Sequence, residues 1–355
     1  MDKVTTVIPS YRRPALLKRA VQSVLSQTHK NVEVHVFDDS SGDETAAVVS
    51  EMSARDPRVK YFCQPVNRGM MQNTAAAVNS VDSEFFTILN DDDFLAPEFF
   101  ATALKAFARH PQAGVFAGRL VYWNHEAPRK TQPCRFLDRG YYEAPDACIR
   151  SLNENKTHTW TSMMFRREVL HCTGGVDPNA GYAADLDFAL RAMALHDTIV
   201  SDARCGVYCM HPGSSSYASW IAPCVESLSY IQESLQRDPA LSAIRSNVIS
   251  AYRRKCRKMI GMAAIMALVR EELSSARVAA EFLHNSAGAP IVGRGLRLAS
   301  SHRLVGACSR LALKSVRAAN HVRKAVQRNS AWRGHEAFVR SVLEHVAAAP
   351  GRPEA

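Results

Sequence analysis

Three consecutive aspartates, Asp91 to Asp93, end an apolar segment in the stretch ILNDDDFLAPEF. Oxygen ligands favour hard divalent cations such as Mg²⁺ or Mn²⁺, and such a cation takes much of its shell from substrate phosphates and water. We therefore expect a divalent cation and a phosphate-bearing substrate at this point of the chain. A solvated acidic turn that caps the following helix is the alternative interpretation.

A second acidic pair, Asp38 and Asp39, also follows a short apolar segment. Short strands and helices alternate through this part of the chain, which predicts a parallel sheet covered on both faces. Ligands of such sheets lie beyond the carboxyl ends of the strands, where both acidic groups would meet. The expected strands are Val4–Pro9, Val32–Phe37, Val59–Phe62 and Phe85–Leu89, and the expected helices are Pro14–Gln27, 43–52, Asn67–Val81 and Pro97–Arg109.

The rest of the chain is less regular. Strands are expected at Val115–Trp123 and Thr159–Phe165, a helix at Asp185–Leu195, and polar loops over 124–158. Of the net charge of +10, residues 1–224 carry 23 basic and 25 acidic side chains, whereas the remaining residues carry 21 and 9. This asymmetry predicts two parts. We expect a catalytic domain over 1–224, a basic helical region over 225–346 and a disordered tail over 347–355.

Composition excludes several classes of protein. The nine cysteines show neither a disulfide framework nor a zinc spacing, so reduced thiols are expected. No apolar run is long enough for a membrane span, and the N-terminus lacks the features of a secretory signal. We therefore expect a cytoplasmic protein.

The stretch VTTVIPSYRRPALLKRAVQSVLSQTHKNVEVHVFDDSSGDET resembles the start of the family 2 inverting glycosyltransferases, which have the GT-A (nucleotide-diphospho-sugar transferase) fold. It is especially similar to the spore-coat polysaccharide glycosyltransferase branch. Asn67-Arg68-Gly69 and EFFTILNDDDFLAPEF continue the resemblance in the same order. It covers residues 3–110 well and 160–217 more loosely. The resemblance implies an α/β GT-A fold with a central, mostly parallel sheet and a helical C-terminal appendage.

The same resemblance implies which residues bind the nucleotide. Asp39 would accept a hydrogen bond from the base, typically uracil. Pro9 and Tyr11 would line the base pocket, and Arg68 would reach the nucleotide. Asp91 would lie near the ribose and the metal.

For the metal, the resemblance implies Asp92 as the principal ligand of Mn²⁺ or Mg²⁺, with His211 near the diphosphate or the metal. Many relatives have an aspartate where this chain has Asn90, which is a neutral and weaker ligand. Asp93 is then expected to be structural, as a cap of the next helix.

The general base is expected in the stretch GGVDPNAGYAADLDFALRAM. Asp185 matches the family's base, which takes the proton of the acceptor hydroxyl. Relatives often carry a glutamate where this chain has Ala184. Asp187 is a second candidate for the base, and a third interpretation is that both aspartates only favour the helix N-terminus. Trp160 and Tyr182 could stack on an acceptor sugar or belong to the core.

Two interpretations of the basic C-terminal third remain open. It could contact an anionic membrane surface, where lipid-linked acceptors reside, or it could be a helical appendage with a solvated basic face. Nucleic acid binding is not expected, because no recognition motif accompanies the basic residues.

The sequence thus predicts an enzyme that transfers a sugar from a nucleoside diphosphate, with UDP favoured, to a carbohydrate or lipid-linked acceptor. Bacterial surface polysaccharide assembly is the expected context. A nucleotidyltransferase is the first alternative, although the PSYRRP turn lacks the glycines that usually hold a triphosphate. A non-catalytic nucleotide-sugar-binding protein is the second, because Asn90 and Ala184 depart from the family pattern.

Overall fold

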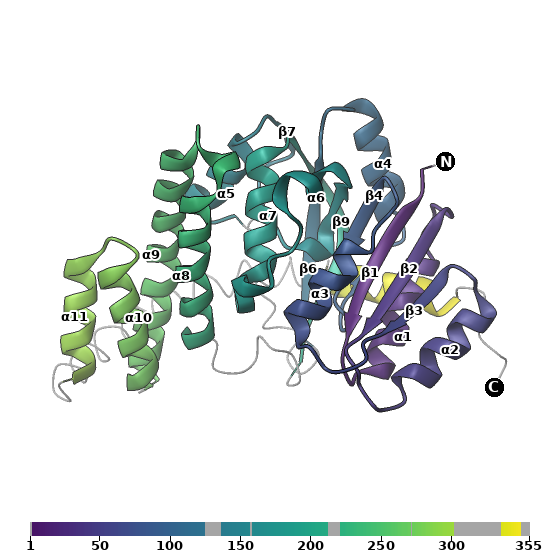
Figure 1. The fold of residues 1–355 in the computed structure, drawn as a ribbon, viewed down its shortest axis with the longest axis horizontal. Coiled ribbons are helices and arrows are strands. Elements are labelled where there is room, and N and C mark those ends of the chain that lie inside the picture. The colour runs from purple at the N-terminus through teal and green to yellow at the C-terminus, as the bar shows by residue number, and fades with distance from the viewer. Residues whose placement is uncertain are drawn as a thin grey trace.

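The computed structural model describes residues 2–124, 136–156, 158–211, 221–270, 272–301 and 335–348. An α/β domain contains the sheet and the N-terminal helices, and helices α8 to α11 extend from one side of it (Figure 1). The architecture confirms the α/β fold with helices appended at the C-terminal side.

The described strands form one nine-stranded sheet in the order β3-β2-β1-β4-β8-β6-β9-β5, with β7 paired to β9. The strands are β1 Val4–Ser10, β2 Val32–Asp38, β3 Val59–Cys63, β4 Phe85–Ile88, β5 Phe94–Leu95, β6 Val115–Asn124, β7 Gly140–Tyr142, β8 Met163–Arg166 and β9 Thr198–Met210. The first four are mutually parallel, as expected from their alternation with helices. β8 runs antiparallel between β4 and β6, and the half of the sheet beyond it mixes both directions.

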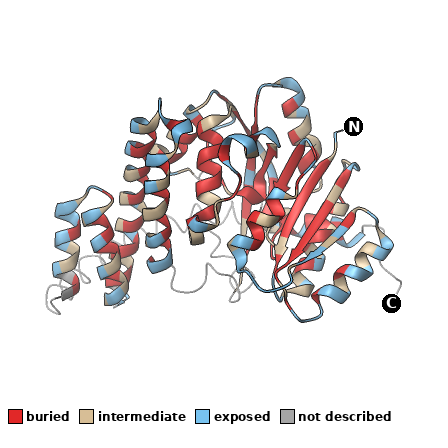
Figure 2. Ribbon diagram, in the orientation of Figure 1, coloured by how far each residue is buried: buried red, intermediate tan, exposed pale blue. Residues whose placement is uncertain are grey.

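Helices cover both faces of the sheet, and most residues of the strands are buried between them (Figure 2). Successive side chains of a strand point to opposite faces. Accordingly, Ile8 packs with the helices α1 and α4, whereas its neighbour Val7 packs with α3 and α7. The helices are α1 Pro14–Leu25, α2 Thr45–Arg55, α3 Met70–Asn79, α4 Phe99–Arg109, α5 Asp146–Glu154, α6 Glu168–Thr173 and α7 Ala184–Leu195.

Several expectations differ from the structure. The strand expected over Thr159–Phe165 begins only at Met163, because Trp160–Ser162 form a short 3₁₀ helix, and the long strand β9 was not expected. α3 begins at Met70 rather than Asn67, because Gly69 adopts a positive φ of 86° and residues 67–69 form a loop against the end of β2. The stretch expected to be loops contains β7 and α5. α5 was missed because it has only nine residues and a mostly polar composition, although its buried residues Ala147, Cys148, Ser151 and Leu152 lie on one side of the helix.

The C-terminal helices continue the core of the α/β domain. Helices α8 to α10 pack in the same apolar cluster as α7, and the expected boundary at residue 224 falls inside α8. They are α8 Ile221–Arg237, α9 Arg245–Val269, α10 Leu273–Asn285 and α11 Pro290–Ser301. None of the helices in the described part of the chain is sufficiently long and apolar to cross a bilayer.

Residues 335–348 form a further helix, drawn in yellow in Figure 1, that lies against the sheet and not beside α11. Its Val339, Val342 and Val346 pack against Phe94 and Val207. The basic residues expected to extend the helical region from Arg303 to Arg328 lie outside the described residues, as does the expected tail beyond residue 348.

Candidate active site

The two acidic groups meet at the end of β1, as the strand order requires. Parallel pairing places Ser10 of β1 opposite Asp38 of β2, and the loop after β4 lies on the other side. The Ser10 hydroxyl donates to Oδ2 of Asp91 at 2.9 Å, and the Ser10 carbonyl accepts from the Asp39 N–H at 3.0 Å. One short segment therefore holds both acidic groups at the carboxyl edge of the sheet.

An arginine bridges the first two aspartates of the triplet. Nη1 of Arg13 lies 3.1 Å from Oδ1 of Asp91 and 2.9 Å from Oδ2 of Asp92. Nε2 of His211 lies 3.2 Å from the same oxygen of Asp92. The expected metal ligands, Asp92 and His211, are therefore neighbours in space although 119 residues separate them.

Burial and the neighbouring charges shift the pKa of Asp91 in different directions. Its side chain is almost fully enclosed, and this burial raises its pKa to about 6. The Arg13 guanidinium lowers that pKa and the adjacent Asp92 carboxylate raises it further. A cation that replaced or joined Arg13 would stabilise both carboxylates in their ionised form.

The third aspartate is structural, but it does not cap a helix. Asp93 is fully buried and accepts from the Cys209 N–H, the Thr161 hydroxyl and the Asn90 amide, each at 2.9 Å. Burial raises its pKa to about 8. The expected cap at the start of α4 is wrong, because Asp93 joins the acidic loop to β9 instead.

Asn90 belongs to the same internal network. Its amide nitrogen donates to Asp93, and its amide oxygen accepts from the Trp160 indole at 3.2 Å. Both ends of the Asn90 side chain are thus used within the protein. Trp160 is buried with its indole N–H bonded, so it belongs to the core rather than to a sugar-stacking surface.

Asp39 holds a short loop at its expected base-binding position. Its Oδ1 accepts from the Arg68 N–H at 2.7 Å and its Oδ2 from the Gly69 N–H at 2.8 Å. Each carboxylate oxygen has a second lone pair, so Asp39 can still accept from a base N–H. Asp38, in contrast, points into the fold and accepts from Ser41 and from the Tyr61 hydroxyl.

The other residues expected at the nucleotide lie around this loop. Pro9 is partly buried on β1, and Arg68 is exposed beside Asp39. The Tyr11 ring is 41% exposed, and the Arg12 guanidinium lies 5.1 Å from its centroid. Tyr11 therefore presents an aromatic surface at the edge where a base would stack.

The two aspartates of α7 have different environments. Asp187 is fully buried and pairs with Arg191 at 2.6 Å, and Arg191 also donates to the carbonyls of Thr173 and Gly175. Asp187 therefore fixes the Gly174-Gly175 turn. Asp185 lies in the first turn of α7 and accepts from the Leu186 N–H at 2.7 Å. The residue keeps part of its surface exposed, although protein atoms surround its carboxyl group. Burial raises the pKa of Asp185 above its usual range, which suits a group that must take up a proton.

Helix α8 supports the loop that leads to Asp185. The Tyr230 hydroxyl of α8 donates to Asp177 at 2.7 Å, and Asp177 accepts the Asn179 N–H at the start of that loop. Gly181 has a positive φ of 58°, and a Cβ there would come within 3.0 Å of the Ser227 hydroxyl. The C-terminal helices therefore help to position the candidate base.

Comparison with known proteins decides the family. The profile of glycosyl transferase family 2 matches residues 5–174, the segment that contains both acidic groups. This segment, just under half of the chain, is a glycosyl transferase family 2 domain.

The chain resembles both curated and solved glycosyltransferases. It is 34% identical over 122 residues to the GalNAc(5)-diNAcBac-PP-undecaprenol beta-1,3-glucosyltransferase of Campylobacter jejuni, which is 34% of this chain and 39% of that relative. The chain thus spans well under two thirds of that relative's length.

Two solved structures share the fold. S. aureus TarS 1–349 in complex with UDP-GlcNAc has a TM-score of 0.63 at 17% identity, covering 87% of this chain and 89% of that one. The mannosyltransferase PcManGT from Pyrobaculum calidifontis, in complex with GDP-Man and Mn²⁺, has a TM-score of 0.53 at 18% identity, covering 98% of this chain and 86% of that one. At these identities the likeness establishes the fold alone.

The family 2 site contains one residue that we did not expect from the sequence, Arg13. It lies in the short turn between β1 and the Pro14 that starts α1, so its backbone lies at the same edge as the acidic groups. A cation in the PSYRRP turn, next to two acidic groups at one edge, is the signal that could have identified it. Arg19 on α1 also reaches the acidic loop and donates to the Asp92 carbonyl.

The residues of this glycosyltransferase site fit a metal that is completed by substrate. No group of three or more His, Cys, Asp or Glu side chains within the described ranges forms a metal cage. Asp92 and His211 instead offer one carboxylate and one imidazole at the edge of the sheet. Mn²⁺ and Mg²⁺ are commonly held by one or two protein carboxylates together with substrate phosphates, so this donor set fits.

Proposed function

We propose that this protein transfers a sugar from a nucleoside diphosphate, with UDP favoured, to an acceptor hydroxyl with inversion at the anomeric carbon. One observation carries the proposal. The end of β1 brings Asp39 and the Asp91–Asp92 pair to a single edge of a family 2 domain, so a nucleotide could bind with its base at one group and its diphosphate at the other.

In this proposal the base of the donor binds at Asp39 and the neighbouring loop. Asp39 accepts from the imide N–H of uracil while the loop at Arg68 and Gly69 holds its carboxylate in place. Tyr11 stacks on the base, and Pro9 closes the pocket behind it. The exposed side chain of Arg68 in this loop supplies positive charge toward the nucleotide.

The diphosphate lies beside the acidic loop in this proposal. Asp92 would hold Mn²⁺ or Mg²⁺ with His211, and Asp91 would lie near the ribose and the metal. The bound cation supplies Lewis-acid stabilisation for the negative charge of the leaving diphosphate. The Arg13 guanidinium, now shared by Asp91 and Asp92, is close enough to turn toward a phosphate oxygen.

Asp185 acts as the general base. The acceptor oxygen attacks the anomeric carbon, the bond from that carbon to the diphosphate oxygen breaks, and the acceptor proton passes to the Asp185 carboxylate. A single displacement from the face opposite the leaving group inverts the configuration. Asp187 cannot share this role while its carboxylate is buried against Arg191.

The acceptor is a carbohydrate or a lipid-linked carbohydrate, in bacterial surface polysaccharide or glycoconjugate assembly. The name of the Campylobacter relative, which includes a polyprenyl diphosphate, supports the lipid-linked class. A cytoplasmic protein could meet such an acceptor at the inner face of the membrane. Ile291, Val292 and Leu298 on α11 are exposed beside Arg294, which supports peripheral contact with an anionic surface.

Calorimetric titration of UDP, GDP and dTDP, each with and without Mn²⁺, tests the donor site. We expect one nucleotide to bind only with the metal, and Asp92→Ala to abolish that binding. Asp82→Ala, which removes an exposed carboxylate away from the site, is the control and should bind as the unaltered protein does.

Three outcomes would count against the proposal. Absence of nucleotide binding under every metal condition would remove the donor-site assignment. If the protein binds a UDP-sugar but releases no UDP from it in the presence of an acceptor, a degenerate binding protein would be favoured. Release of inorganic diphosphate from a nucleoside triphosphate and a sugar phosphate would favour a nucleotidyltransferase.

A further inference from the structure

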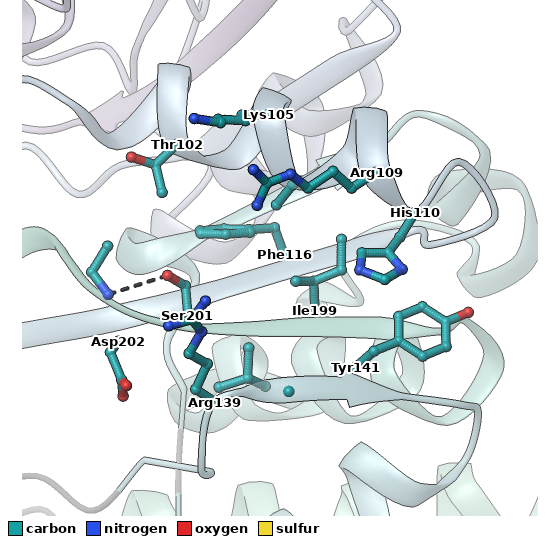
Figure 3. Close-up of a pocket in the computed structure, with 14 residues that line it drawn as sticks. Thr102, Lys105, Arg109, His110, Phe116, Arg139, Tyr141, Ile199, Ser201 and Asp202 are labelled. Atoms are coloured by element: carbon teal, nitrogen blue, oxygen red, sulfur yellow. Dashed lines mark hydrogen bonds between the residues drawn. The ribbon is translucent and has the colours of Figure 1, made fainter.

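A pocket of about 500 Å³ lies at the edge of the sheet opposite the acidic loop. Figure 3 shows Lys105 and Arg109 of α4 along one wall and Arg139 on the other, with Phe116 and Ile199 between the two walls. None of the residues assigned to the donor, the metal or the base lines this pocket.

The pocket is positively charged. Lys105, Arg109 and Arg139 are exposed, and none of them forms an ion pair with any residue in the described part of the chain. One acid, Asp202, lies among the lining residues, and it is already paired with Arg119. A hollow lined by cations with low-dielectric walls focuses the electrostatic potential and attracts anions.

One wall of the pocket is formed in advance. The rings of His110 and Tyr141 stack with their centroids 4.8 Å apart, and the Tyr141 hydroxyl donates to Asp197. Asp197 also accepts from the Ala144 N–H at 2.8 Å, which ties the strand β7 to the start of β9. Because these contacts already order the wall, a ligand that binds there loses little free energy to the conformational entropy of the wall.

This pocket is separate from the proposed donor site. It is lined by the first residues of β6 and β9, whereas the acidic loop contacts the far end of β9 through the Cys209 N–H. The strand from Ala203 to Cys209 rises about 3.3 Å per residue, which places the two sites on the order of 20 Å apart. A single nucleotide sugar bound at the acidic loop therefore leaves the pocket open to a second ligand.

We propose that this pocket binds the phosphate group of a second ligand whose apolar part lies against the partly buried Ala106, Tyr141 and Ala203. Arginine binds phosphate through a planar fork of donors, and Arg109 and Arg139 approach the pocket from opposite walls. A volume of this size exceeds what a phosphate alone would fill and is typical of sites for small organic molecules. The phosphate could belong to a lipid or to a free phosphorylated metabolite, and the same cations would bind either one.

The test is calorimetric titration of the full chain with inorganic phosphate and with decyl phosphate below its micelle-forming concentration, in EDTA to keep metals out of the donor site. We expect both probes to bind. Lys105→Ala combined with Arg109→Ala should weaken each by at least about tenfold, and Arg139→Ala should act in the same direction. The matched control, Lys60→Ala with Arg277→Ala, removes two exposed cations elsewhere and should leave both affinities unchanged.

The two probes also distinguish the sources. Tighter binding of decyl phosphate that is lost in the double variant identifies an amphiphile, whereas equal affinities identify a free phosphate compound. Binding of UDP with Mn²⁺ should survive in every variant, which separates this test from that of the proposed function. The inference is overturned if neither probe binds the unaltered protein, or if pocket and control variants lose affinity equally.

Discussion

Nη1 of Arg13 lies 2.9 Å from Oδ2 of Asp92, so the principal candidate metal ligand is already paired with a cation of the protein. The same nitrogen lies 3.1 Å from Asp91. A divalent ion must compete with this guanidinium for the two carboxylates. A nucleotide diphosphate would relieve the competition by giving Arg13 another anion to bind.

Removal of Arg13 is therefore expected to separate metal binding from nucleotide binding. In Arg13→Gln, Mn²⁺ should bind about tenfold more tightly in the absence of nucleotide, because both carboxylates lose their competing charge. UDP affinity in the presence of Mn²⁺ should fall. Electron paramagnetic resonance of free Mn²⁺ measures the first quantity and calorimetry the second. Unchanged Mn²⁺ affinity in Arg13→Gln would contradict the competition.

Restoring the family's aspartate at position 90 is expected to harm the protein. In Asn90→Asp the side chain can no longer donate an amide N–H to Asp93, and a second acidic group is placed next to the buried Asp93 carboxyl group, whose oxygen lies 2.9 Å from the Asn90 amide nitrogen. The loss of unfolding free energy should be about 1–3 kcal/mol, measured by urea denaturation. Metal affinity should not rise, because the indole of Trp160 still holds the other oxygen.

The control for that substitution is Asn247→Asp on the exposed side of α9, which adds the same charge without a buried neighbour. A gain in Mn²⁺ affinity for Asn90→Asp, with stability unchanged, would show that position 90 faces the metal rather than the interior.

The sequence was sufficient to predict the half of the fold that contains the proposed nucleotide site. Strands and helices alternate strictly up to Arg109, and parallel strands place every carboxyl end at one edge, so Asp39 and Asp92 had to be near each other. The confirmed GT-A fold follows from that pattern together with the family resemblance. The roles assigned to individual residues stay predictions.

The remaining features depend on contacts between distant parts of the chain. The Asp93 network joins the acidic loop to Cys209, and only the fold places that residue there. Likewise, α8 holds the loop before Asp185 through Tyr230 and Asp177, a contact across 53 residues. A composition shift near residue 224 suggested an appendage, but charge asymmetry carries no information about which apolar surfaces meet.

Substitution of Asp185 is expected to lower activity, whereas substitution of Asp187 is expected to lower stability. Asp185→Asn should keep its stability and UDP affinity and lose activity by about 10²–10⁴-fold, as for removal of a general base. Asp187→Asn should instead lower the unfolding free energy, because the buried Arg191 loses its charged partner. Transfer rates and urea denaturation of both variants test this assignment.

The pH dependence of the transfer reaction is a second test of Asp185 as the general base. Burial raises the pKa of Asp185, so the carboxylate is protonated, and inactive as a base, up to a higher pH than an ordinary aspartate. We expect kcat/KM to rise with pH through that pKa and the rise to be absent in Asp185→Asn. If kcat/KM still rises with pH in Asp185→Asn, the rise belongs to the titration of another group.

A buried histidine is expected to make the protein sensitive to acid. His158 is fully enclosed, accepts from the Leu137 N–H at 3.3 Å and lies 3.3 Å from the Gly118 carbonyl. Burial lowers its pKa from 6.5 to about 4. The neutral ring is favoured in the folded protein, so its stabilisation is complete above pH 6.5 and is lost as the pH falls toward 4. Over that interval the unfolding free energy should fall by up to about 3 kcal/mol.

Urea denaturation at a series of pH values measures this loss, and His158→Gln provides the comparison because its amide can replace both contacts without titrating near neutral pH. The slope of stability against pH between 6.5 and 4 should be smaller in His158→Gln than in the unaltered protein. His171, an exposed histidine on α6, is the control, and His171→Gln should leave the slope unchanged. Equal slopes in all three proteins would mean that His158 takes up a proton in the folded state as readily as in the unfolded chain.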